Sequence, residues 1–124
     1  MTTLNETTQK FLINCQDGVN NVERATISFI LAVTASKTNE TAVFITSDAA
    51  KLCVKGGVDG LVAQGYEPLA NLVASFIENG GKIWLCPACV KAKGLTENDL
   101  IDGVEIAGAP RTMAFMAGGA QLLA

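Results

Sequence analysis

The chain has 124 residues, 49% of them hydrophobic, which is enough to bury one core, so we expect residues 1–124 to form a single domain. Nine Lys and Arg residues stand against twelve Asp and Glu residues. The net charge of -3 argues against binding a nucleic-acid backbone, because that binding needs clustered positive charge. No apolar run is long enough to span a bilayer, and the polar start lacks the features of a signal peptide. We therefore expect a cytoplasmic protein.

The first half of the chain predicts two strands, each followed by a helix. Residues 10–15 form an apolar run, and a helix with regularly spaced apolar residues is predicted to begin after the capping residue Asn20. Residues 41–46 are rich in β-branched and aromatic side chains and predict the second strand. A short helix that begins at Ser47 and carries Cys53 is expected to follow it.

The second half repeats this alternation. An amphipathic helix is predicted after Pro68, and the apolar residues 82–85 predict the third strand. A fourth strand is predicted at residues 104–107, a helix that begins at Pro110, and a fifth strand at residues 121–124. Strands this apolar need cover on both faces, so we expect an α/β fold: a three-layer α/β/α sandwich around a mainly parallel five-stranded sheet.

The third strand ends at a Cys-x-x-Cys motif formed by Cys86 and Cys89. Pro87 suits the first turn of a helix, which places Cys86 at the helix cap. Free N–H groups and the positive end of the helix dipole favour a thiolate at such a position, and Lys91 and Lys93 add positive charge nearby. Cys89 lies one turn further in, close enough to attack a sulfur carried on Cys86.

The other residues limit what this pair can do. Cys15 ends the first strand, and Cys53 lies in the helix after the second; both are expected to be small buried hydrophobes, although both lie near the edge where parallel sheets collect reaction sites. A structural zinc site would need Cys15 and Cys53 as its remaining ligands, because the chain has no histidine. The missing histidine also excludes a Cys-His nucleophile. A thioredoxin-like dithiol also places Cys-x-x-Cys at a strand–helix junction. Here, however, the motif follows two complete strand–helix units, which does not fit the thioredoxin order.

Residues 84–95, followed by residues 100–106, resemble the DsrE/DsrF-like family of sulfur-relay proteins. In that family a strand ends in Cys, a short helix of small residues follows, and a basic-Gly pair closes it. The basic-Gly pair falls on Lys93-Gly94, and Asp17-Gly18 after the first strand fits as well. The resemblance covers nearly the whole chain.

The resemblance implies a small α/β protein that assembles as a homotrimer or hexamer and carries sulfane sulfur as a persulfide on Cys86. Its partners would be persulfide donor and thiol acceptor proteins, and neither a cofactor nor a metal is implied. Cys89 departs from the pattern, since relay subunits have a small residue there. The alternatives are a dithiol oxidoreductase that uses Cys86 and Cys89, or a non-catalytic oligomeric binding protein. Whether the chain acts as a sulfurtransferase or only as a carrier stays open.

The last predicted helix bears on assembly and on the site. Residues 113–117 are apolar without a gap, which predicts a helix with no solvent face, buried in a subunit interface or under the sheet. Arg111 follows the fourth strand and either reaches the edge at Cys86, where it would hold an anionic sulfur group, or is simply solvated.

Overall fold

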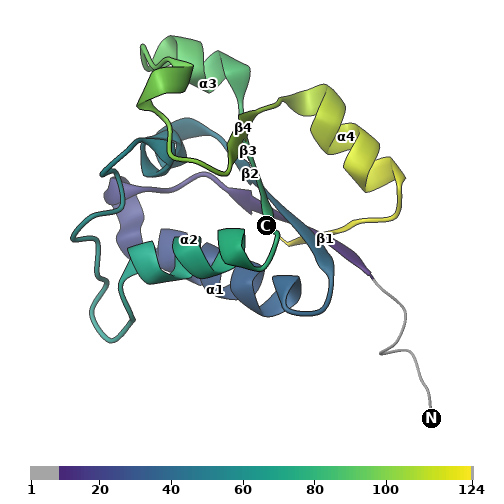
Figure 1. Ribbon diagram of the computed structural model, residues 1–124, viewed down its shortest axis with the longest axis horizontal. Coiled ribbons are helices and arrows are strands. Elements are labelled where there is room, and N and C mark those ends of the chain that lie inside the picture. The colour runs from purple at the N-terminus through teal and green to yellow at the C-terminus, as the bar shows by residue number, and fades with distance from the viewer. Residues whose placement is uncertain (1–8, 124) are drawn as a thin grey trace.

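The computed structural model describes residues 9–123 and forms a five-stranded, all-parallel sheet with helices on both faces (Figure 1). The strands lie in the order β4-β3-β2-β1-β5. Their bounds are β1 (Lys10–Cys15), β2 (Glu40–Ile45), β3 (Lys82–Leu85), β4 (Val104–Ile106) and β5 (Gln121–Leu123). The predicted α/β sandwich and its strands are confirmed, while Ala124, included in the fifth, lies outside the described residues.

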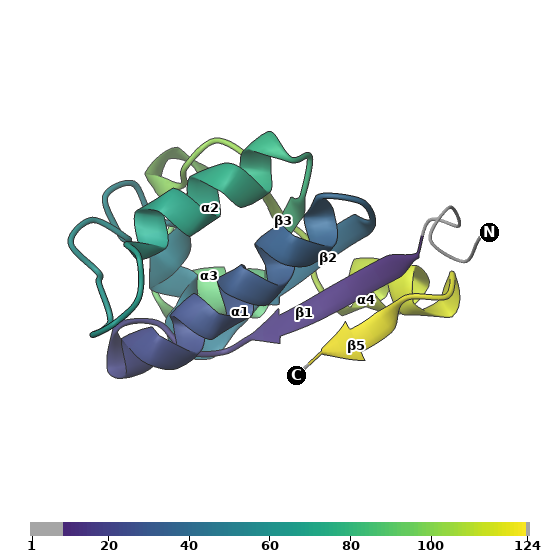
Figure 2. The same cartoon turned by 90° about the horizontal axis from the view of Figure 1, so that it is seen from below.

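The order of the strands decides which helix covers which face. From β1 to β4 the chain advances in one direction, so right-handed crossovers place α1 (Val22–Ser36) and α2 (Leu69–Glu78) on the same face. Figure 2 shows these two helices side by side. The return from β4 to β5 runs the opposite way, which carries α4 (Ala109–Ala117) over the other face. The remaining α-helix, α3 (Pro87–Ala92), starts beyond the carboxyl end of β3.

The larger core lies between the sheet and the pair α1 and α2. Alternate strand residues point into it, among them Ile13, Val43 and Ile83, none more than 1% exposed. Phe29 of α1 and Phe76 of α2 meet edge to face above them, with ring centroids 6.0 Å apart. This core holds in place the sheet whose strand ends position Cys86.

A smaller core lies under α4. Four buried residues form it: Leu12, Ala42, Trp84 and Ala107. The Phe115 ring of α4 packs edge-on against Trp84, with centroids 5.2 Å apart. The prediction that α4 has no solvent face is wrong, since Met113 is 64% exposed. Among the described helices, α4, of nine residues, is the one that covers this face, so it buries only the side turned to the sheet.

The short helix predicted after β2 is present. It spans Ser47–Cys53 as a 3-10 helix, and Ser47 opens it in the left-handed region at φ 57°. Among the described residues, no helix is long and apolar enough to cross a membrane.

Candidate functional site

The carboxyl ends of β3 and β4 form a switch point in the sheet. The chain leaves β3 for α3, whose Val90 joins the larger core, and it leaves β4 for α4 on the opposite face. Where neighbouring connections diverge in this way, an open sheet leaves a crevice beyond its strand ends. A cleft of about 680 Å³ opens at this point, lined by residues 86–88 and 106–111.

Cys86 lines this cleft at the junction of β3 and α3, as predicted. It is the N-cap residue of α3, and Pro87 takes the first helical position. Its backbone N–H donates to the Ile45 carbonyl at 3.0 Å, and its own carbonyl accepts from Val90 N–H at 3.0 Å. The thiol is free and half-buried. Two backbone hydrogen bonds therefore hold the backbone of this half-buried residue at the wall of the cleft.

Cys89 has different surroundings. Its Sγ accepts a hydrogen bond from the Ser47 backbone N–H at 3.2 Å, and the residue packs against the larger core. An ion pair of 3.5 Å between Lys93 and Asp48 makes a second link between α3 and the segment after β2. Lys93, expected to add charge near the thiols, is thus engaged with a carboxylate. Cys89 is held at the contact between α3 and Ser47.

Gly108 brings the two walls of the cleft together. A Cβ atom at this position would lie 2.9 Å from Cδ of Pro87, closer than real contacts allow. Glycine therefore lets the β4–α4 connection approach the start of α3. Gly108 was not among the predicted site residues, and its signal in the sequence was a glycine soon after the fourth strand.

Arg111 does reach the edge at Cys86, since it lines the same cleft. Its guanidinium lies 5.7 Å from the ring centroid of Trp84, and its Nη1 lies 3.5 Å from Glu105 Oε2. Trp84 Nε1 donates to the other Glu105 oxygen at 3.3 Å. The pairing of Trp84 with Glu105 across β3 and β4 thus orients Arg111. The roles of Trp84 and Glu105 were also missed, because they depend on the strand register.

Cys15 and Cys53 do not join this cleft. They are 1% and 2% exposed and belong to the larger core. Burial raises the pKa of Cys15 to about 11, and hydrogen bonding with the Ser28 side chain opposes this rise only in part. Burial, with the nearby Cys15, raises the pKa of Cys53 to about 12. These two thiols stay protonated at neutral pH. Within residues 9–123, no three His, Cys, Asp or Glu side chains gather as metal ligands would.

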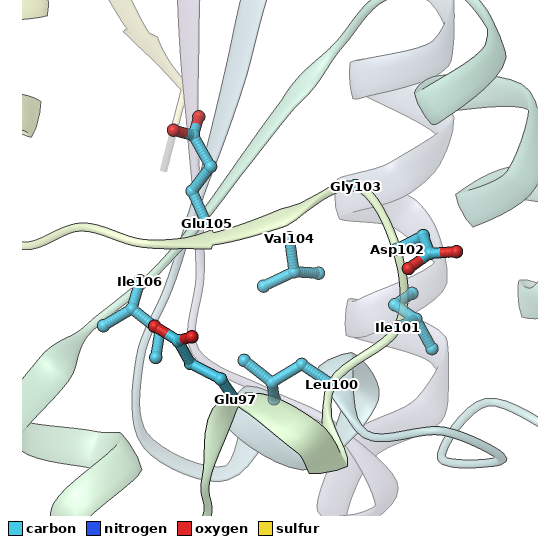
Figure 3. A pocket seen from close by; sticks show the side chains of 8 residues that line it. All are labelled: Glu97, Leu100, Ile101, Asp102, Gly103, Val104, Glu105 and Ile106. Atoms are coloured by element: carbon cyan, nitrogen blue, oxygen red, sulfur yellow. The ribbon is translucent and has the colours of Figure 1, made fainter.

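A further cleft, of about 310 Å³, lies at the outer edge of β4. Figure 3 shows the side chains of Glu97, Leu100, Val104 and Ile106 converging there, while Glu105 points away from them. No cysteine lines this cleft, which borders the cleft at Cys86 through the shared residue Ile106.

The fold and the cleft define a small all-parallel α/β protein with a cysteine at the switch point of its sheet. The profile of the DsrE/DsrF-like family matches residues 9–124, so the chain belongs to that family, which is of the sulfur-relay type.

Two relatives are archaeal proteins named as uncharacterized. MJ0760 of Methanocaldococcus jannaschii is 34% identical over 107 residues, which cover 86% of this chain and 38% of that protein. The chain therefore matches well under half of MJ0760. MK0008 of Methanopyrus kandleri is 36% identical over 86 residues, which cover 68% of each chain.

Solved structures show the same fold at low identity. The ychN protein from E. coli superposes with a TM-score of 0.73 at 20% identity, covering 94% of this chain and all of its own. MTH1491 from Methanobacterium thermoautotrophicum, a protein of unknown function, has a TM-score of 0.65 at 13% identity and covers 94% of this chain and 98% of its own.

Proposed function

We propose that this protein is a cytoplasmic carrier of sulfane sulfur, held as a persulfide on Cys86. The observation that carries the proposal is the position of Cys86, a half-buried thiol at the cap of α3 that lines the cleft at the switch point. Of the four cysteines, Cys15 and Cys53 are buried in the core and Cys89 is bonded to Ser47. Cys86 is therefore the thiol best placed to meet a partner.

The transfer needs no external oxidant or reductant. The Cys86 thiolate attacks the outer sulfur of a donor persulfide, a new S–S bond forms on Cys86, and the donor leaves as its thiolate. An acceptor thiolate then attacks that outer sulfur and regenerates Cys86. No side chain caps α3, so its first N–H groups remain available to stabilise the anionic sulfur.

Cys89 gives this carrier a way to unload without an acceptor. Its thiolate can attack the inner sulfur of the Cys86 persulfide, which forms a Cys86–Cys89 disulfide and releases the outer sulfur as sulfide. This attack requires Cys89 to leave its hydrogen bond with Ser47 N–H. Ser47 thus opposes unloading and favours carriage.

Intact-mass analysis after treatment with a persulfide donor tests the proposal. Wild type is expected to gain one sulfur atom, Cys86→Ser none, and Cys53→Ala, a control that removes a core thiol, one. Sulfur addition to Cys86→Ser, or none to wild type, would show that Cys86 is not the carrier.

The second candidate is a dithiol oxidoreductase, favoured by the free Cys86 and Cys89 thiols at a strand–helix junction. Turnover of insulin reduction with thioredoxin reductase, lost in Cys89→Ser, would support that class. Silence in this assay together with sulfur uptake supports the carrier. If neither occurs and Cys86 reacts like a free thiol in solution, the protein belongs with the non-catalytic binding proteins.

We also infer a homo-oligomer, a trimer or a hexamer, since DsrE/DsrF-like proteins often form oligomers. One turn apart on α1, Ile27 and Leu31 are 40% and 39% exposed, an apolar pair suited to contact with a second copy.

A further inference from the structure

A third cleft, of about 410 Å³, lies on the α4 face of the sheet near the carboxyl ends of β1 and β2. Its lining includes Asn14, Thr46 and Thr112, and it shares no residue with the cleft at Cys86. The position beyond the strand ends is where open parallel sheets bind ligands. This cleft plays no part in the sulfur transfer proposed above.

The side-chain hydroxyl of Thr112 has no hydrogen-bond partner among the described residues. The residue is 8% exposed, and its buried Oγ1 has no partner. The two other threonines within α-helices behave differently: Thr26 and Thr34 donate to the carbonyl four residues earlier, at 2.7 and 2.8 Å. A buried, unpaired hydroxyl destabilises a folded chain unless something supplies its partner.

Other polar groups line the same cleft. Asn14 follows the buried Ile13 in β1, and Thr46 comes directly after β2; neither side chain makes a hydrogen bond to another described residue. The exposed Gln16 lines the cleft as well, and the rest of the wall is apolar, formed by Leu12, Phe44, Met113, Met116 and Leu122. No charged side chain lines the cleft. Apolar walls with a few convergent polar groups are typical of small-molecule sites.

We propose that this cleft binds a small neutral molecule with an apolar body and an amide or alcohol group, which hydrogen-bonds to Thr112 and Asn14. A charged ligand would leave its charge unpaired against apolar walls, which disfavours that class. Rotation of Thr112 about χ1 turns its hydroxyl toward a ligand without moving the helix backbone. Because the site lies apart from Cys86, binding persists in a Cys86→Ser variant.

The test uses benzamide as the probe and benzoate as its charged counterpart. NMR titration of the methyl-labelled full chain is expected to show saturable benzamide shifts at Thr112 and Met116, with benzoate binding at least several-fold more weakly. Thr112→Val keeps the shape and removes the hydroxyl, so benzamide affinity is expected to fall about fivefold, the effect of one hydrogen bond. The control is Thr34→Val, the same substitution in α1, distant in sequence from Thr112, and it is expected to leave the benzamide affinity unchanged.

Thermal unfolding without ligand gives an independent readout. Thr112→Val is expected to be at least as stable as wild type, because it removes a hydroxyl that has no partner. A clear loss of stability would mean that the free protein already pairs this hydroxyl, which overturns the proposal. Equal binding of benzamide to wild type and Thr112→Val overturns it as well. The proposal is also overturned if wild type does not bind benzamide, for example because a second copy of the chain fills the cleft.

Discussion

Cys86 and Cys89 lie three positions apart, yet their side chains have different surroundings. Cys86 opens into the cleft, whereas the sulfur of Cys89 accepts the Ser47 N–H and packs toward the core. A shared motif therefore does not imply a shared role. The difference follows from the cap position: Cys86 has non-helical backbone angles, with ψ 123°, whereas Cys89 lies inside the helix.

Cys89→Ser is expected to retain sulfur on Cys86 longer than wild type. The serine hydroxyl can keep the hydrogen bond from Ser47 but cannot displace sulfide from a persulfide. We expect sulfide release from the loaded protein to slow about tenfold or more, since the intramolecular attack is lost. Release measured in the absence of acceptor thiols checks this, and release as fast as that of wild type would exclude Cys89 as the unloading group.

Cys15 and Cys53 predict a loss of stability at high pH. Their pKa values in the folded chain are raised to about 11 and about 12, above the ordinary value of 9.0, so the unfolded chain ionises first as pH rises. The stabilisation is complete below pH 9 and is lost as pH rises toward 11 and 12. From pH 8 to pH 10 we expect the free energy of unfolding to fall by roughly 3 kcal/mol through these two thiols.

Urea unfolding under reducing conditions at the two pH values measures this fall. A Cys15→Ala, Cys53→Ala variant provides the comparison, because it removes both thiols while Cys86 and Cys89 remain. Its stability is expected to depend less on pH over the same interval. An equal dependence in both proteins would assign the fall to other groups.

At the scale of elements, the cleft depends on how closely the start of α4 approaches the start of α3. Gly108 allows the β4–α4 connection to lie against Pro87, the residue that follows Cys86. On its other side, α3 is linked to the segment after β2 through Ser47 and Asp48. The helix that carries the site is therefore held from two directions.

Gly108→Ala is expected to disturb Cys86 without touching it. The added methyl group would lie 2.9 Å from Cδ of a rigid proline ring, so Pro87 and the cap of α3 must shift. We expect about 1–3 kcal/mol of destabilisation, as for overpacking elsewhere, and slower alkylation of Cys86 by iodoacetamide. Gly118→Ala is the control, because its nearest neighbour is the flexible end of Lys10 at 3.1 Å. Equal alkylation rates in both variants would contradict this account.

Much of this arrangement was readable from the sequence. Apolar and β-branched runs such as residues 41–46 identified the strands, and Pro87 after an apolar run identified the cap at Cys86. The contacts around the site were not readable, because they join residues distant in the chain. Ser47 meets Cys89 across 42 positions, and Trp84 meets Glu105 only in the register of β3 and β4. The exposed side of α4 could not be predicted either, because it depends on how many helices cover that face of the sheet.

At the scale of the whole molecule, apolar side chains remain exposed beside the sheet. Ile27 and Leu31 of α1 border a groove of about 260 Å³, together with the ion pair between Arg24 and Asp17. An apolar pair rimmed by charged groups has the composition of an interface between subunits. The groove shares no lining residue with the cleft at Cys86, but it shares Asn14 and Gln16 with the cleft at Thr112.

The double substitution Ile27→Glu, Leu31→Glu is therefore expected to dissociate the oligomer into monomers. Two carboxylates in the contact would have to lose water without a positive partner, at a cost of several kcal/mol, which exceeds what most small interfaces tolerate. Light scattering after size exclusion gives the mass, and Val62→Glu, at a loop residue that is 53% exposed, is the control. An unchanged mass would place the interface elsewhere. Retained sulfur uptake by the monomer would show that Cys86 acts within a single chain, whereas lost uptake would show that a second copy completes its cleft.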